Sequence, residues 1–323
     1  MIGCGALGRI HIESVARIPA AHFVAFCDVN RAAAEACLQE FGGRYATDEV
    51  DRILEDSGID AIYICTRHDS HASLAIAAAR AKKHIFIEKP LALTLEECEA
   101  ISEAVTLSGI YLMPAFKMRF YPLVQRAKAF IPNPQLVLGQ MMDNRWPDAY
   151  WAQDPVQGGA NVLSQGCHTT DIMRYFAGGD LSTVLATGGA VTHPGHPCLD
   201  LCVATIRFSN GVLGSWVQGD IVTPPLTSKF FFEVFGDGRS VQLYDRLKKA
   251  VFFDGKESWV EERPEEEGFY LENVEFIEAI RENRQPSVTV HDGIQATRMV
   301  LEAERSIRGQ SSRQFAGAAE GRR

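Results

Sequence analysis

Short apolar runs alternate with longer alanine-rich or amphipathic segments over the first third of the chain. The runs are typical of strands buried on both faces, because they are a few residues long, rich in β-branched side chains and bounded by polar or turn residues. The longer segments have the length and the capping residues of helices. The predicted strands are 22–28, 60–65, 84–87 and 110–113, and the predicted helices are 9–16, 30–41, 48–56, 72–81 and one that follows Thr94. This alternation predicts a doubly wound parallel sheet.

The pattern changes from residue 116, where most apolar runs become longer and alternate with polar positions. Such runs are typical of antiparallel strands with one buried face. The predicted strands are 135–146, 184–192, 199–208, 212–221, 229–235, 241–244 and 251–253. Ser209-Asn210-Gly211 has the composition of a hairpin turn between two of them. Two helices, 270–284 and 292–308, are expected to close this part of the chain.

A glycine-rich turn opens the chain and has the spacing of a dinucleotide-binding site. Three glycines follow the pattern G-x-G-x-x-G, and Asp28 ends a predicted strand 20 residues after the last of them. Such glycines let the backbone approach a diphosphate at a helix N-terminus, and the acidic residue binds ribose hydroxyls. Asp28 would repel a 2′-phosphate and favours NAD, whereas Arg31 keeps NADP as the minor alternative. The predicted cofactor-binding residues in this stretch are Gly3, Gly5, Ala6, Leu7, Gly8 and Asp28.

Only Met1 and Ile2 precede the first glycine, although this turn normally follows a full buried strand. In the common strand order of a Rossmann-type fold, that strand is the middle of the sheet. Its two neighbours would then lack partners. We interpret the first strand as truncated, with two explanations open: a true gene start upstream of Met1, or a weakened protein with a gapped sheet.

A second stretch places charge at the end of a buried strand. Glu88, Lys89 and Pro90 follow an apolar run, and Pro90 cannot continue the strand ladder. The carboxyl ends of strands in an open α/β sheet form the crevice where ligands bind. A lysine fixed there is suited to contact a substrate hydroxyl beside a cofactor. The alternative is a solvated pair of loop charges.

Composition narrows the function further. The chain has 323 residues, 46% of them hydrophobic, and a formal net charge of −9, which argues against a nucleic-acid partner. We expect no membrane span, because no apolar stretch approaches the roughly 18 residues that one needs. The eight cysteines form no C-x-x-C pair and suit reduced core thiols, so we expect a cytoplasmic protein without a metal site.

The glycine turn, Asp28, Thr66 with His71 five residues later, and the Glu88-Lys89-Pro90 stretch together resemble the Gfo/Idh/MocA family. Its members use NAD or NADP to oxidise or reduce sugars, cyclitols and related polyols. The resemblance implies that Lys89 contacts the reacting hydroxyl. It places Thr66, His71 and Glu88 at the cofactor. The chain departs from the family at residue 67, where arginine replaces the usual proline and either binds an anionic substrate group or is solvated.

Gly158 to Asp171 matches the second signature of this family, a glycine-led helix with a catalytic histidine. By that resemblance His168 is catalytic, and Ser164 stands where the family usually has aspartate. Helical spacing puts Ser164, His168 and Asp171 on one face. Without the aspartate, either Asp171 supports the imidazole or the histidine works at a lower pKa. The alternative is a core histidine capped by a hydroxyl.

Further residues are candidates for substrate binding. Family members often have an arginine near position 119, and we prefer Arg119 over Lys117 for this role. Trp146 lies among polar and aromatic residues and is suited to stack on a sugar ring, although such a cluster also suits a packed loop or a subunit contact. His193 and His196 stand between prolines and glycine, and we interpret that segment as a loop.

We therefore predict a Rossmann-type dinucleotide-binding domain over residues 1–115, an α+β domain with a large, mainly antiparallel open sheet over 116–309, and a disordered tail over 310–323. The predicted function is hydride transfer between NAD and a secondary alcohol of a sugar or polyol. A non-catalytic dinucleotide sensor and an NAD-dependent glycosidase remain alternatives. Because the open sheet needs a cover, and the family usually covers it with a second copy, we expect a homo-oligomer, either a dimer or a tetramer.

Overall fold

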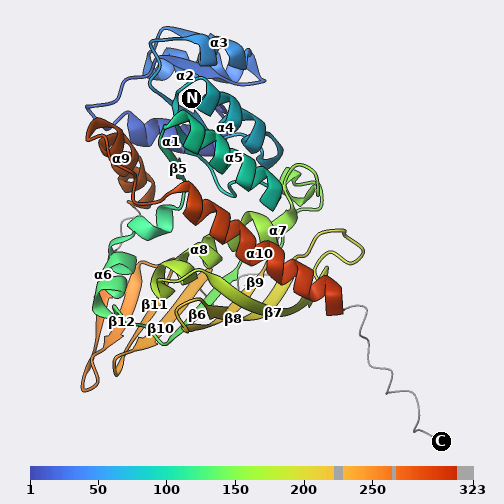
Figure 1. The fold of residues 1–323 in the computed structure, drawn as a ribbon, viewed down its shortest axis with the longest axis vertical. Coiled ribbons are helices and arrows are strands. Elements are labelled where there is room, and N and C mark those ends of the chain that lie inside the picture. Colours follow the sequence, from blue (N-terminus) through green and yellow to red (C-terminus); the bar gives the residue numbers. More distant parts are fainter. Residues whose placement is uncertain (222–227, 264–266, 311–323) are drawn as a thin grey trace, which may run out of the picture.

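The structure, a computed structural model, describes residues 1–221, 228–263 and 267–310, and its N-terminal part is built on parallel strands (Figure 1). The strands are β1 (Ala25–Cys27), β2 (Tyr45–Thr47), β3 (Ala61–Ile64), β4 (His84–Ile87) and β5 (Leu112–Pro114). The helical segments are α1 (Ala6–Val15), α2 (Arg31–Phe41), α3 (Val50–Glu55), η1 (His68–Ser70), α4 (His71–Arg80) and α5 (Leu95–Ser108). β1 pairs with β2, and β3, β4 and β5 pair with one another, all in parallel. The predicted parallel sheet is confirmed, although β2 was not predicted.

Ile2 joins the two groups of parallel strands. It forms single bridges to Cys27 and to Ile64, one on each side. Its amide donates to the carbonyl of Tyr63 at 2.8 Å, and the amide of Gly3 donates to Cys27 at 2.8 Å. One residue thus stands at the position of a central strand, and the sheet is divided into two parts around it.

Helix α5 shows how local sequence sets the element boundaries. The hydroxyl of Thr94 accepts a hydrogen bond from the amide of Glu97, and the Glu97 carboxylate accepts one from the amide of Thr94, both at 3.1 Å. This is a capping box, which satisfies backbone donors that the first turn leaves unpaired. The helix ends at Ser108 and is capped by Gly109, whose φ of 71° is readily adopted only by a residue without Cβ.

The second part of the chain forms a sheet of eight strands. They are β6 (Leu136–Met142), β7 (Leu181–Gly189), β8 (Leu201–Phe208), β9 (Leu213–Gly219), β10 (Phe230–Gly236), β11 (Arg239–Tyr244), β12 (Lys249–Phe253) and β13 (Ser258–Glu262). Their order is β13-β12-β11-β10-β6-β9-β8-β7, and only β6 and β9 pair in parallel. The large, mainly antiparallel sheet is therefore confirmed, with β13 as an unpredicted edge strand.

Helices cover one face of this sheet (Figure 1). The helical segments are η2 (Lys117–Phe120), α6 (Pro122–Phe130), η3 (Trp151–Gln153), α7 (Ala160–Ser164), α8 (Gly166–Ala177), α9 (Gly268–Arg281) and α10 (Val290–Gln310). α8 packs on β6 and β9, and α10 on β7, while α9 returns to contact α1. The buried and exposed positions of β8 alternate, as expected when only one face is covered. Among the described residues, Figure 1 shows no helix on the other face.

Two sequence-based expectations concern the end of the chain and the membrane. The tail predicted over 310–323 lies outside the described residues, except that residue 310 still belongs to α10. In the part of the chain that the structure describes, no helix combines the length and the apolar character that crossing a bilayer requires.

Candidate functional site

Lys89 follows β4 and reaches the second half of the chain. β4 ends at Ile87, and the next two side chains, Glu88 and Lys89, are buried. The Nζ atom of Lys89 donates a hydrogen bond of 2.9 Å to the carbonyl oxygen of Ser164. Because an ammonium group has three N–H donors, this bond leaves others for a ligand. Lys89 therefore places a positive charge where the two halves of the molecule meet.

The segment that carries His168 is broken at Gln165, which corrects the expectation of one continuous helix. α7 ends at Ser164 and α8 begins one residue after the break. In an unbroken helix the amide of His168 would donate to the carbonyl of Ser164. It donates instead to the carbonyl of Gln165 at 3.0 Å, so the Ser164 carbonyl is available to Lys89. The break thus connects the backbone beside His168 to the lysine.

His168 is a buried imidazole in a positively charged environment. Its side chain is buried, and its Nδ1 atom has no hydrogen-bond partner. Burial lowers the pKa of His168 well below its usual value, and the charges of Lys89, Lys117 and Lys229 lower it further. The ring is therefore neutral at pH 7 and retains a lone pair. A neutral imidazole of this kind can accept a proton.

Asp171 and Arg119 form an ion pair away from the histidine. Arg119 donates to Asp171 through Nε at 2.9 Å and through NH2 at 2.5 Å, and to Asp292 at 3.0 Å. Burial raises the pKa of Asp171 to about 6, although the charge of Arg119 opposes the shift. The contacts join Asp171 to Arg119 rather than to His168. Support of His168 by Asp171 and substrate binding by Arg119 remain predictions without a direct contact.

Two polar residues near the histidine were missed from the sequence. Lys229 donates to a carboxylate oxygen of Asp143 at 2.9 Å, and the indole of Trp146 donates to the same oxygen at 3.2 Å. The charge of Lys229 is one of the smaller causes that lower the pKa of His168. Trp146 is mostly buried and packs edge-on against Tyr150. Its indole is thus held in a polar cluster with Asp143 and Lys229.

The pairing of Asp143 with Lys229 had a signal in the strand pattern. Asp143 directly follows β6, and Lys229 directly precedes β10. The two strands are antiparallel neighbours, so the end of one and the start of the other meet at the same edge of the sheet. The order of the strands was needed to use this signal, and the sequence alone does not supply it.

The glycine turn has the shape that a diphosphate needs. A Cβ on Gly3, whose φ is +92°, would lie 2.5 Å from a backbone oxygen, and a Cβ on Gly8 would lie 2.0 Å from the carbonyl oxygen of Gly3. A Cβ on Gly5 would meet nothing within 4 Å. Gly5, Ala6 and Leu7 are exposed at the start of α1, where no side chain caps the free amides. These residues fit the cofactor that the turn predicts.

Asp28 stands beside this turn at the end of β1. One carboxylate oxygen accepts from the amide of Cys4 at 2.7 Å, and the other accepts from the amide of Asn30 at 2.8 Å. The side chain is fixed yet partly exposed, as a ligand of ribose hydroxyls must be. Arg31 pairs with Glu35 at 3.0 Å, so its charge is already engaged on the helix surface. The arrangement fits NAD better than NADP.

His71 and Glu88 tie the walls of the crevice together. The ring of His71 contacts the carbonyl of Pro90 at 2.8 Å and that of Thr66 at 3.3 Å, and burial lowers its pKa. Glu88 contacts His11 on α1 at 2.9 Å. Burial would raise the pKa of Glu88, but the hydrogen bond and the charge of His11, together with Lys89, lower it to about 2. Both side chains are engaged with protein groups, and the predicted cofactor contacts of Thr66, His71 and Glu88 remain predictions.

Arg67 connects the loop after β3 to the segment around η3. Its guanidinium hydrogen-bonds Gln157 and lies 5.7 Å from the ring centroid of Trp151. The neighbouring His68 contacts the carbonyl of Gly158 at 2.9 Å. Arg67 is therefore an exposed loop arginine whose guanidinium already has one protein partner. It fixes the η3 segment against the predicted cofactor crevice.

Comparison with known proteins agrees with these features. A family model described as "Oxidoreductase family, NAD-binding Rossmann fold" matches residues 1–116, and one described as "Oxidoreductase family, C-terminal alpha/beta domain" matches residues 138–313. The scyllo-inositol 2-dehydrogenase (NAD(+)) of Bacillus subtilis is 29% identical over 323 residues, covering 95% of this chain and 93% of the relative. The myo-inositol 2-dehydrogenase of Thermotoga maritima is 25% identical over 332 residues, covering 95% of each protein.

Solved structures share the whole fold. A levoglucosan dehydrogenase in complex with NADH and levoglucosan superposes with a TM-score of 0.87 at 24% identity, covering 96% of both chains. An oxidoreductase domain protein from Kribbella flavida gives a TM-score of 0.86 at 23% identity, covering 97% of this chain and 96% of the other. The chain therefore belongs to the Gfo/Idh/MocA family of oxidoreductases, and its N-terminal domain is an NAD-binding Rossmann fold.

Proposed function

We propose that this protein catalyses reversible oxidation of a secondary alcohol on a cyclitol or sugar ring, with NAD as the oxidant. The observation that carries the proposal is the contact of Lys89 with the carbonyl of Ser164, four residues before His168, which joins opposite halves of the chain. The named relatives that act on inositols suggest the substrate class. A ring polyol also suits the ion pair of Asp143 and Lys229, which has no net charge and offers a hydrogen-bond donor and an acceptor together.

His168 accepts the hydroxyl proton in this proposal. Its neutral, buried ring supports the role, because burial and three nearby ammonium groups disfavour the protonated form. Lys89 binds the same oxygen and stabilises the negative charge that develops as the proton leaves. The bound nicotinamide supplies the acceptor for the hydride. Ser164 contributes its carbonyl, which orients the ammonium group of Lys89.

The cofactor is held by the turn from Gly3 to Gly8 and by Asp28. Backbone amides at the start of α1 would bind the diphosphate, and the Asp28 carboxylate would bind the adenine ribose. Thr66, His71 and Glu88 shape the crevice near the nicotinamide, since they stand at or beside the ends of β3 and β4. Trp146 and Arg119 line or support the substrate side.

The proposal extends to assembly and location. The helix-free face of the large sheet carries exposed apolar side chains, among them Leu185, Val203 and Leu213. A second copy of the chain, in a dimer or tetramer, would cover this face. The domain division at residues 115 and 116 and a cytoplasmic location belong to the same proposal, and the eight unpaired cysteines suit a reducing compartment.

The test is a substrate panel followed by NADH absorbance. Purified protein is incubated with NAD or NADP and with scyllo-inositol, myo-inositol, aldoses or sugar acids. The proposal expects NADH formation with at least one ring polyol, and a lower rate with NADP. Cofactor binding without turnover on any compound would favour a sensor, and release of a sugar leaving group without net NADH would favour a glycosidase. Either result would overturn the proposed dehydrogenase.

A further inference from the structure

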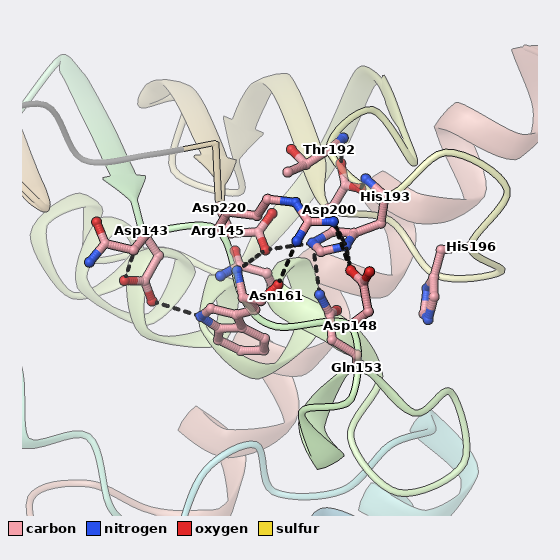
Figure 2. A network of polar contacts seen from close by, with 12 residues as sticks. Asp143, Arg145, Asp148, Gln153, Asn161, Thr192, His193, His196, Asp200 and Asp220 are labelled. Carbon is pink, nitrogen blue, oxygen red and sulfur yellow. Dashed lines mark hydrogen bonds and ion pairs between the residues drawn. The ribbon is translucent and has the colours of Figure 1, made fainter.

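Three loop segments that are distant in sequence meet around His193. One follows β6 and contains Asp148 and Gln153, the second lies between β7 and β8 and contains His193 and Asp200, and the third is Asp220 after β9 (Figure 2). His193, Asp200, Gln153 and Asp220 are all buried. Buried polar groups in such number need partners that compensate for their lost hydration. From the sequence, His193 was predicted only as part of a loop.

The ring of His193 has a carboxylate on each side. Its Nδ1 atom lies 2.9 Å from a carboxylate oxygen of Asp148, and its Nε2 atom lies 3.0 Å from a carboxylate oxygen of Asp220. The amide nitrogen of Gln153 lies 2.8 Å from the same Nε2 atom. In Figure 2 the Gln153 side chain points at the histidine.

Neither neutral form of the His193 ring satisfies all of these contacts as they stand. If the ring donates from Nδ1 to Asp148, the lone pair of Nε2 faces the Asp220 carboxylate, which also has only lone pairs. If Nε2 carries the proton instead, Nδ1 can accept from Arg145 at 3.2 Å and Nε2 can donate to Asp220, but Nε2 still faces the N–H groups of Gln153. A cation bound to Nε2 removes the conflict, because it attracts the imidazole lone pair and the carboxylate together. Histidines that bind metals commonly donate their other ring N–H to a carboxylate, which is the place of Asp148 here.

Two buried oxygens point to the same missing partner. The Oε1 atom of Gln153 and the Oδ1 atom of Asp220 are buried without any hydrogen-bond partner. Gln153 is 2% exposed and Asp220 is 0% exposed. Exchanging the two ends of the Gln153 amide by rotation turns its oxygen toward Nε2 of His193. Both oxygens would then be available to bind a cation.

The negative charges of Asp200 and Asp220 in this cluster are also uncompensated by a lysine or arginine among the described residues. The Asp200 carboxylate accepts amide hydrogen bonds from Val191, Thr192 and His193, which leaves one of its four lone-pair positions. One ligand atom from each of His193, Asp200 and Asp220 lies within 4.8 Å of the other two. Arg145 pairs with Asp148 at 2.7 Å, and its NH2 atom also lies 3.2 Å from Nδ1 of His193, the ring nitrogen on the far side from Nε2. Two buried carboxylates thus lie beside one imidazole.

We propose that His193, Asp200 and Asp220, with the amide oxygen of Gln153, bind one divalent transition-metal ion, Zn²⁺ or Mn²⁺. One imidazole with carboxylate and amide oxygens suits these ions, whereas Mg²⁺ prefers oxygen ligands and retained water. The ion would join three loops beside the segment that Arg67 contacts. Its role is structural, and it goes beyond the proposed dehydrogenase because it takes part in no step of hydride transfer.

Metal content of the full-length, tag-free protein tests this proposal. The protein is stripped with a chelator, incubated separately with Zn²⁺, Mn²⁺ or Mg²⁺, desalted and analysed by mass spectrometry of the elements. We expect one equivalent of Zn²⁺ or Mn²⁺ per chain, no retained Mg²⁺, and a melting temperature that rises with the bound ion. Wild-type protein that retains neither Zn²⁺ nor Mn²⁺ would overturn the proposal, without bearing on turnover.

Variants identify the ligands. Asp220→Asn and His193→Gln should each weaken Zn²⁺ retention more than about 10-fold. His196→Gln, in the same loop but outside the ligand set, is the matched control and should retain the ion. Equal loss in the control variant, or ring nitrogen spectra of the wild-type protein incubated with Zn²⁺ that show both His193 nitrogens protonated, would overturn the assignment. If a variant does not fold, the wild-type measurement still decides.

Discussion

His168 and His193 are both buried histidines of the second half of the chain, each 7% exposed, but their surroundings are opposite. His168 has ammonium groups nearby and an Nδ1 atom without a partner. His193 has carboxylates at both ring nitrogens and an amide on one of them. The first ring is kept neutral and open to a ligand, whereas the second has polar partners at both of its nitrogens.

Burial has a different consequence for each of the two histidines. Nearby cations disfavour the protonated form of a buried imidazole. The ring therefore stays neutral and is available to accept the proton of a bound alcohol. A buried imidazole among carboxylates attracts a positive charge and joins the segments that supply them. We therefore assign proton acceptance to His168 and the joining of loop segments to His193. Variants of the two residues should have different main effects.

The largest expected effect is on turnover of His168→Gln. Loss of the proton acceptor should lower kcat/KM for the preferred polyol about 10²- to 10⁴-fold while leaving the melting temperature nearly unchanged. His193→Gln should instead lower the melting temperature. Steady-state NADH formation and thermal melting of both variants provide the comparison. Normal turnover of His168→Gln would contradict the role assigned to His168.

Lys89→Met should follow in size. Removing one charged donor from the developing negative oxygen is expected to lower kcat about 10²- to 10³-fold, with NAD affinity retained. Lys256→Met, on the exposed surface, is the control and should match the wild type. Fluorescence titration of the cofactor and initial rates separate the two quantities. A variant that loses NAD binding but keeps kcat would contradict the assigned role.

A third buried histidine, His11, extends the comparison to stability. Its partner Glu88 has a pKa of about 2, against an ordinary value of 4.5. Because the folded-state pKa is depressed, the contribution of Glu88 is complete above pH 4.5 and is lost as the pH falls toward 2. Glu88→Gln should reduce the free energy of unfolding by about 3 kcal/mol at neutral pH, and the deficit should close toward pH 2. Denaturant unfolding against pH measures it, with the exposed Glu13→Gln as control. A deficit that does not depend on pH would refute the coupling.

The smallest expected effect is a shift in the pH profile of Lys229→Met. Burial is the main cause of the lowered pKa of His168, and the charge of Lys229 is one of three smaller causes. Removing that charge, and leaving Asp143 unpaired nearby, should raise the pKa of His168. The acidic limb of kcat/KM should move to higher pH, while the limiting rate changes less. An unmoved or downward-shifted limb would place Lys229 outside the electrostatic environment of the base.

Local sequence was sufficient for much of the fold. The spacing from Gly8 to Asp28, the apolar run before Glu88 and the capping box at Thr94 each depend on nearby residues, and the structure has the corresponding turn, strand and helix. The short strand β2 was missed because three residues between turn positions give little periodicity. The edge strand β13 was missed because its charged positions resemble a loop.

The contacts of the site were harder to predict because they join distant residues. Arg119 pairs with Asp292 across 173 positions, and His193 meets Asp148 across 45. The break at Gln165 has only a weak local signal in Gly166, where an added Cβ would lie 2.9 Å from the ring of Trp216. The family resemblance located Lys89 and His168, but only the structure joins Lys89 to the carbonyl of Ser164.

A double-mutant cycle with Lys89→Met and His168→Gln tests the central claim most directly. If both side chains act on one alcohol oxygen in one transition state, their effects are not additive. The double variant should then turn over within about 10-fold of the slower single variant. Losses that multiply across the cycle would show that the two residues act independently, and would contradict a shared site.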